Sequence, residues 1–126
     1  MKSYYIGIDL GTSAVKLLLT DETGTILNIV TKEYPLSFPK PGWSEQNPLD
    51  WWNACCIGIS ELLNGFDKID VKGIGVAGQM HGLVALDAHD EVIRPAILWN
   101  DGRTAEETEW LNTVIGKEKA ILELFK

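Results

Sequence analysis

The chain has 126 residues, of which 45% are hydrophobic and 23% are charged, so it is long enough to form one hydrophobic core. Eleven basic residues stand against eighteen acidic ones, and the net charge of -7 argues against nucleic acid or an anionic membrane surface as a partner. The two cysteines, Cys55 and Cys56, are adjacent and do not indicate a disulfide framework. The net charge favours small polar or neutral partners. The cysteines suit a reducing compartment, and no apolar run approaches the roughly 18 residues of a membrane span, so we expect a cytoplasmic protein.

The first third of the chain has strand character. Residues 4–8, 14–19 and 26–34 are rich in β-branched, aromatic and aliphatic residues, and residues 21–24 form a clear turn signal. This pattern predicts a three-stranded antiparallel meander. Residues 35–46 contain three prolines with Gly42 and Trp43, which indicates a loop held by an aromatic side chain.

A helix is predicted over residues 48–63. Asn47 is a good N-cap and Pro48 suits the first helical position, while Asn64-Gly65 supplies a stop. Its apolar residues recur at helical spacing and predict the buried face: Trp52, Cys55, Cys56, Ile59, Leu62 and Leu63.

The remainder alternates short strands with helices. Residues 71–76, 83–86 and 96–99 have strand character. Thr104 and Glu107 form a capping-box pattern that opens a helix ending at Gly116, with an apolar stripe of Trp110, Leu111, Val114 and Ile115. A last amphipathic segment from Lys117, with Ile121, Leu124 and Phe125, has no glycine or proline stop. We therefore expect residues 1–126 to be one partial domain of a longer protein.

The stretch YIGIDLGTS at residues 5–13 places one carboxylate, Asp9, before a glycine and two hydroxyl residues. We expect Asp9 to lie near the end of a largely buried hairpin, where a lone carboxylate needs a metal, a cation or backbone donors. Successive N–H groups of a Gly-Thr-Ser turn can bind an anion, Lys16 adds a positive charge, and a neighbouring aspartate can hold Mg²⁺ through water. An ordinary hairpin, with Asp9 satisfied by turn amides and Lys16 solvated, is the alternative.

A second glycine pattern, GIGVAG at residues 73–78, matches the GxGxxG motif. A dinucleotide-binding loop must follow a strand and open a helix, whereas these glycines lie within a strand pattern. We interpret them as small residues that let a neighbouring element pack close to the backbone.

Two further segments, GQMHG at residues 78–82 and LWNDGR at residues 98–103, place polar groups at strand ends. Together they offer amides, an imidazole, an indole, a carboxylate and a guanidinium, which suits a polyhydroxylated ligand. The alternatives are that His81 is a structural residue and that Asp101 and Arg103 form a local ion pair in a turn. Metal ligation is not indicated, because no His/Cys/Asp cluster has ligand spacing.

These segments, together with PGWSEQNP at residues 41–48, resemble the FGGY carbohydrate kinases over essentially the whole chain, and within that family the xylulokinases. The 5–13 segment is shared with the wider actin-like ATPases, whereas the 78–82 and 98–103 segments are more specific. The resemblance implies an α/β fold with two actin-like, ribonuclease-H-like lobes. This chain would be the first part of the N-terminal lobe: a mixed sheet that begins with the three-stranded antiparallel meander and is flanked by helices.

The resemblance also implies ATP with Mg²⁺ as cofactors, and transfer of the γ-phosphoryl group of ATP to D-xylulose, giving the 5-phosphate. Asp9 would assist Mg²⁺, Gly11, Thr12, Ser13 and Lys16 would face the terminal phosphates, and the ketose pocket would comprise Met80, His81, Trp99 and Asn100. Asp101 and Arg103 would shape that pocket.

In this family the aspartate that acts as general base lies beyond residue 126, as does the adenosine-binding lobe, so we expect the 126 residues alone to be inactive. A gluconate kinase and a non-catalytic actin-like module remain alternatives, and homodimerisation is left open.

Overall fold

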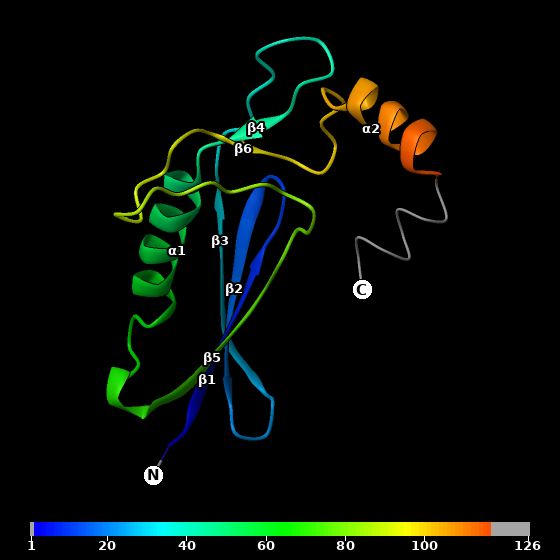
Figure 1. Ribbon diagram of the computed structural model, residues 1–126. Coiled ribbons are helices and arrows are strands. Elements are labelled where there is room, and N and C mark those ends of the chain that lie inside the picture. The colour runs from blue at the N-terminus through cyan, green and yellow to red at the C-terminus, as the bar shows by residue number, and fades with distance from the viewer. Residues whose placement is uncertain (1, 117–126) are drawn as a thin grey trace.

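The computed structural model describes residues 2–116, and its centre is a four-stranded mixed sheet in the order β3-β2-β1-β5. β1 (Tyr4–Leu10), β2 (Ala14–Asp21) and β3 (Ile26–Glu33) form the predicted antiparallel meander. β5 (Val71–Gly78) returns to lie parallel to β1 (Figure 1). The meander prediction is confirmed: β1 and β2 bury alternate residues, and β3 alternates exposed with half-buried ones.

The core lies between the sheet and α1 (Pro48–Leu62). Alternate residues of the first two strands face this helix and are buried, namely Tyr4, Ile6, Ile8, Val15, Leu17 and Leu19. Asn47 caps the helix as predicted, its side chain accepting from the Leu49 N–H at 3.1 Å. After the helix, Gly65 adopts φ 84°, which confirms the left-handed stop. A 3₁₀ turn, η1 (Lys68–Asp70), then leads into β5.

The buried face of α1 differs in part from the prediction. Leu62 and Leu63 are buried as predicted, but Trp52 and Cys56 are exposed, and Ala54 and Gly58 are buried instead. Small residues at this face let the helix approach the sheet: a Cβ placed on Gly58 would lie only 2.5 Å from Leu17 Cδ1. Because α1 packs closely against β2, the helix face with Ala54 and Gly58 is buried and the face with Trp52 is exposed.

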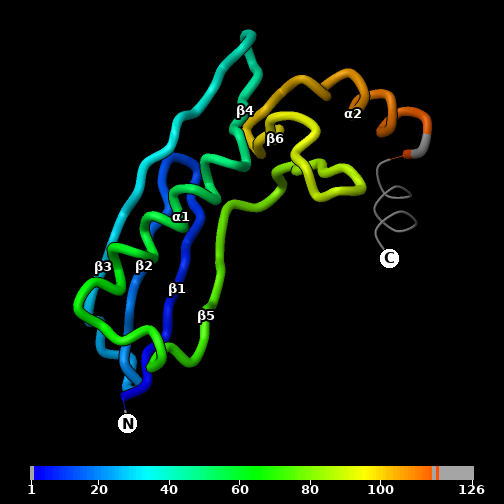
Figure 2. Tube along the Cα trace, turned by 90° about the vertical axis from the view of Figure 1, so that its left-hand side faces the viewer, coloured from blue at the N-terminus to red at the C-terminus, as the bar shows by residue number. Residues whose placement is uncertain are grey.

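A second, two-stranded sheet pairs β4 (Glu45–Gln46) with β6 (Ala96–Ile97) at one end of the large sheet, as both views show (Figures 1 and 2). β4 was predicted as loop, and its pairing partner lies about fifty residues away in sequence. The strand predicted over 83–86 is wrong. This exposed segment has only the isolated bridges Leu83↔Ile97 and Leu86↔Val92, which are too few to form a ladder.

The last described elements are α2 (Ala105–Leu111) and a π-helical turn, η2 (Asn112–Gly116). The capping-box prediction is wrong: the Thr104 side chain makes no cap hydrogen bond, because Thr104 has ψ 19° instead of the extended backbone of an N-cap. Trp110, Leu111 and Val114 of the predicted apolar stripe are exposed. The amphipathic segment predicted from Lys117 lies outside the described residues. Between residues 2 and 116, no helix is both long and apolar enough to cross a membrane.

Candidate functional site

Parallel pairing of β1 with β5 brings two of the predicted motifs to one edge of the sheet. The register aligns Leu10 with Gly78, so the 11–13 turn and residues 79–82 begin at neighbouring strand ends. The Gln79 N–H donates to the Leu10 carbonyl at 2.9 Å and extends the pairing by one residue. A Cβ on Gly78 would lie 3.1 Å from the Leu10 carbonyl oxygen, so this glycine of the GxGxxG pattern does permit a close approach, inside a strand.

Asp9 is exposed, and the prediction that it is a buried carboxylate is wrong. The cause is the strand alternation: Ile8 faces α1, so Asp9 lies on the opposite face of the sheet. Lys16 lies directly across from it in the β1–β2 register and is also exposed. Within residues 2–116, the Asp9 side chain has no hydrogen-bond or ion-pair partner, so its carboxylate is available to a ligand.

The 11–13 turn has all three of its carbonyl groups bonded to the protein behind it. Gly11 O accepts from the Tyr34 hydroxyl, Thr12 O accepts from Gln46 Nε2 at 2.7 Å, and Ser13 O accepts from the Tyr34 N–H at 3.2 Å. The N–H groups of Thr12 and Ser13 have no partner in the described part of the chain. Two consecutive unpaired N–H groups are the donors that the predicted anion site requires, and the binding of an anion there stays a prediction.

Tyr34 remains a hydrogen-bond donor over the whole physiological range. Burial is the main factor that raises the pKa of its hydroxyl to about 12, with smaller contributions from the negative charges of Cys55 and Asp9. The neutral phenol therefore holds the Gly11 carbonyl at any pH at which the protein functions.

The Thr12 hydroxyl connects three of the predicted motifs. It donates to Gln79 Oε1 at 3.1 Å and accepts from the Trp99 indole Nε1 at 3.3 Å. Its single proton is therefore directed to Gln79, while the neighbouring Ser13 side chain is exposed.

The 78–82 and 98–103 segments lie side by side. The Leu83 N–H donates to Ile97 O at 2.9 Å, directly after the first segment and directly before the second. Met80 is 71% and Trp99 58% exposed, and His81 is exposed with φ 62°, a left-handed conformation that is uncommon for a residue with a side chain. These side chains are therefore open to a ligand at the same edge as the 11–13 turn.

Asn100 lines a hollow of about 540 Å³ together with residues 38–44. Met80, His81 and Trp99 do not line this hollow. The structure thus brings Thr12 into contact with both Gln79 and Trp99, whereas Asn100 lies beside the proline-rich loop.

Asp101 and Arg103 form the ion pair that the sequence analysis gave as an alternative. Their interactions extend beyond a local turn, because both residues also bond to the 35–46 loop. Asp101 Oδ2 is 2.7 Å from Arg103 Nη2 and accepts from the Ser44 N–H at 2.7 Å, while Arg103 also pairs with Glu45 Oε1 at 2.8 Å. The Arg103 guanidinium stacks 3.7 Å from the Trp43 ring centroid. The side-chain hydrogen bond from Arg103 is the main cause that holds the pKa of Asp101 well below its usual range. This network fastens the 35–46 loop to the 98–103 segment.

Sequence reasoning missed two residues that hold the 11–13 turn, Tyr34 and Gln46. Gln46 is only 2% exposed and bonds to residues of three separate segments. In the sequence, Tyr34 is the last residue of the 26–34 segment with strand character. A single buried glutamine in a proline-rich loop produces no hydrophobic periodicity. The only signal in the sequence is that a polar residue, Gln46, lies between Trp43 and Trp51.

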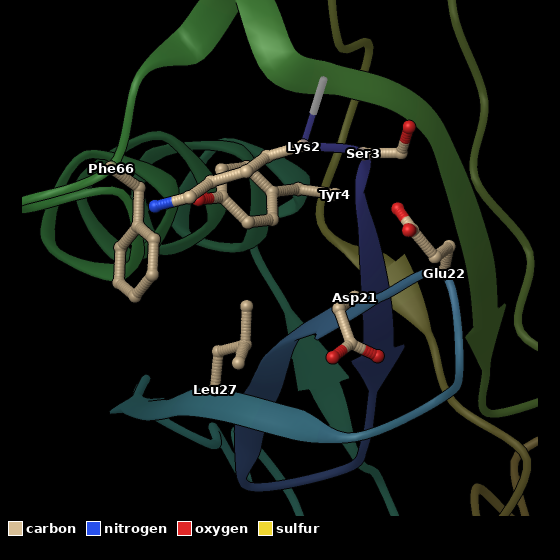
Figure 3. A pocket seen from close by; sticks show the side chains of 7 residues that line it. All are labelled: Lys2, Ser3, Tyr4, Asp21, Glu22, Leu27 and Phe66. Atoms are coloured by element: carbon tan, nitrogen blue, oxygen red, sulfur yellow. The ribbon is translucent and has the colours of Figure 1, made fainter.

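Another hollow, of about 330 Å³, lies at the opposite end of the strands, beside the start of β1 (Figure 3). None of the predicted site residues lines it; its lining is Lys2, Ser3, Tyr4, Asp21, Glu22, Leu27 and Phe66. This hollow is therefore not part of the candidate site.

The described residues contain no group of three or more His, Cys, Asp or Glu side chains placed to hold a metal. The exposed carboxylate of Asp9, beside a turn with two unpaired N–H groups, nevertheless fits Mg²⁺, which is commonly held by one or two carboxylates together with substrate phosphates and water.

The chain is similar to known carbohydrate kinases. The model of the FGGY family of carbohydrate kinases, N-terminal domain, matches residues 4–123. Xylulose kinase of Escherichia coli K12 is 47% identical over 117 residues, which cover 93% of this chain and 24% of that protein.

Two solved structures share the fold. A xyloylose kinase from Brucella ovis superimposes with a TM-score of 0.83 at 46% identity, over 87% of this chain and 24% of that one. Gluconate kinase from Lactobacillus acidophilus superimposes with a TM-score of 0.90 at 29% identity, over 97% of this chain and 25% of that one.

The chain thus spans about a quarter of the length of these relatives. Its mixed sheet with a strand meander is part of the actin-like, ribonuclease-H-like fold of such kinases. With a family match over nearly its whole length and a relative at 47% identity, the chain belongs to the FGGY family of carbohydrate kinases.

Proposed function

We propose that this chain is the N-terminal part of an ATP-dependent sugar kinase that transfers the γ-phosphoryl group of ATP to D-xylulose. One observation carries the proposal: the Thr12 hydroxyl, in the anion-binding turn, bonds to both Gln79 and Trp99 of the two sugar-side segments. Phosphoryl transfer depends mainly on the positioning and charge stabilisation of its two substrates. A contact that joins the phosphate turn to the sugar-side segments supports that requirement directly.

The phosphate side uses backbone groups more than side chains. The Thr12 and Ser13 N–H groups and the Ser13 hydroxyl would donate to a terminal phosphate, and Lys16 would add a positive charge on the same sheet face as Asp9. Asp9 would hold Mg²⁺, which when bound to ATP supplies charge neutralisation at the phosphates. A Cβ on Gly11 would lie 3.0 Å from the Ala14 carbonyl oxygen, so glycine lets this turn close tightly.

The sugar side offers exposed groups of mixed chemistry. Met80 and His81 would contact the ketose, and the Trp99 ring would form an apolar wall beside its hydroxyl groups. Asn100 would contribute from the side of the proline-rich loop. The general base and the adenosine-binding lobe are proposed to lie in the remainder of a longer protein, in keeping with relatives of which this chain covers 24%.

A substrate panel on the full-length protein tests the proposal. With ATP and Mg²⁺, we expect the highest kcat/KM on D-xylulose, compared with D-ribulose, glycerol and D-gluconate. Higher efficiency on gluconate would favour the gluconate kinase alternative, whose structural neighbour is closely superimposable but only 29% identical. A folded full-length protein that releases no ADP with any sugar would instead favour a non-catalytic actin-like module.

A further inference from the structure

We infer that Gln46 is a positioning residue that sets both the direction of the Ser13 N–H in the 11–13 turn and the place of Gln79 beside it. The effect of Gln46 on catalysis rests on the proposed kinase function, whereas its effect on the turn does not. Gln46 lies in β4, outside every segment assigned a role in phosphate or sugar binding, and it is 2% exposed.

All four hydrogen-bonding positions of the Gln46 side-chain amide are used. Its Nε2 donates to Thr12 O at 2.7 Å and to Pro35 O at 3.2 Å. Its Oε1 accepts from Trp51 Nε1 at 3.1 Å and from Gln79 Nε2 at 3.2 Å. The partners fix the orientation of the amide, because two carbonyl oxygens require the NH₂ group and an indole N–H requires the oxygen.

The planarity of the peptide bond explains how Gln46 acts on the turn. Thr12 C=O and Ser13 N–H belong to one planar trans peptide unit, so they point in opposite directions. When Gln46 holds the carbonyl toward the protein interior, the N–H is turned away from it. The Tyr34 hydroxyl has the same effect on the preceding unit, since it holds Gly11 O and thereby orients the Thr12 N–H.

The other end of the same amide reaches the sugar side. Gln46 Oε1 accepts from Gln79, whose own Oε1 accepts from the Thr12 hydroxyl. Thr12, Gln46 and Gln79 thus form a closed set of hydrogen bonds in which backbone and side chain of Thr12 are both held. Few other residues could replace Gln46: glutamate lacks both donors, and methionine of similar size leaves the buried partners unpaired.

Two variants of the full-length protein and a matched control test the inference. Gln46→Met removes all four hydrogen bonds, and Gln46→Glu removes only the two donors toward Thr12 and Pro35. The control, Trp51→Phe, removes a buried hydrogen bond of Gln46 that reaches neither the turn nor Gln79. The measurements are thermal stability, kcat and KM for D-xylulose and ATP, and amide hydrogen exchange of residues 10–14 without ligand.

We expect both Gln46 variants to lose kcat/KM on the order of 10²-fold, mostly in kcat, because misplacement of reacting groups by about 1 Å has effects of that size. The Gly11 amide, which donates within the turn, should exchange faster in both variants. Trp51→Phe should lower the melting temperature while leaving kinetics and exchange at the turn near the wild-type values.

The inference is overturned if the Gln46 variants, once corrected for folded fraction, have the kinetics and turn exchange of Trp51→Phe. If the wild-type protein phosphorylates no sugar, the proposed function fails instead. In that case the exchange comparison alone decides the role of Gln46: faster exchange at the turn supports it, and unchanged exchange overturns it.

Discussion

At the scale of single residues, the backbone of His81 gives a specific test of its role. His81 has φ 62° and an exposed side chain beside the turn edge of the sheet. His81→Asn keeps a residue that tolerates this left-handed conformation, whereas His81→Ala does not. If the imidazole contacts the sugar, both variants should raise KM for D-xylulose about tenfold or more, with KM for ATP unchanged. Loss confined to His81→Ala would assign the effect to backbone strain alone.

The buried carboxylate of Asp101 gives a prediction for acid stability. Its pKa is lowered in the folded protein, so its contribution to stability is complete above the ordinary carboxyl pKa of about 3.9 and is lost as pH falls below that value. Asp101→Asn should lower the melting temperature at pH 7, and the difference from wild type should narrow toward pH 3. Glu106→Gln, at an exposed position, serves as the control, and an equal narrowing there would contradict the prediction.

Residue chemistry was predictable from the sequence, whereas side-chain exposure and long-range contacts were not. The chemistry of the 11–13 turn could be read from its residue types, but the exposure of Asp9 could not, because it depends on which sheet face α1 covers. The contacts of Thr12 with Gln79 and Trp99 span 67 and 87 positions. No local pattern encodes pairs so far apart, and Gln46 was missed for the same reason.

At the scale of elements, α1 was predictable almost to the residue because its N-cap, its proline and its glycine stop are local signals. The structure of the 83–86 segment and of the backbone at Thr104 was not predictable in this way, since each depends on neighbouring segments and not on a local signal. The buried face of α1 belongs to this second group. Its contact at Gly58 with Leu17 follows from tertiary packing, which outweighs the apolar periodicity that pointed to Trp52.

Gly58→Ala should destabilise the protein although alanine is the better helix former. The new Cβ would lie 2.5 Å from Leu17 Cδ1, and Leu17 is completely buried. Overpacking of this kind costs about 1–3 kcal/mol, while the gain in helix propensity is at most about 1 kcal/mol. We expect a net loss of roughly 1 kcal/mol in the free energy of unfolding, measured by urea denaturation. Ser60→Ala, at an exposed position of α1, should leave stability unchanged or raise it slightly.

At the scale of the whole molecule, the parallel return of β5 to β1 is what creates the candidate site. It brings strand ends separated by about seventy residues together, and the 11–13 turn and the two sugar-side segments meet there. Ile74 and Val76 of β5 are exposed, and nothing among residues 2–116 covers them. The family match could be inferred from four motifs, while the joining of those motifs through Thr12 needed the structure.

The most direct measurement of that joining is a double-mutant cycle on D-xylulose-dependent ADP release by the full-length protein. Thr12→Val and Gln79→Met each remove one partner of the hydrogen bond between the turn and the 78–82 segment. If the two motifs form one site, each single variant should lose activity, and the double variant should lose less than the sum of the two losses, with a coupling of about 0.5–3 kcal/mol. Strictly additive losses, or no D-xylulose-dependent ADP release by the wild-type protein, would contradict the account.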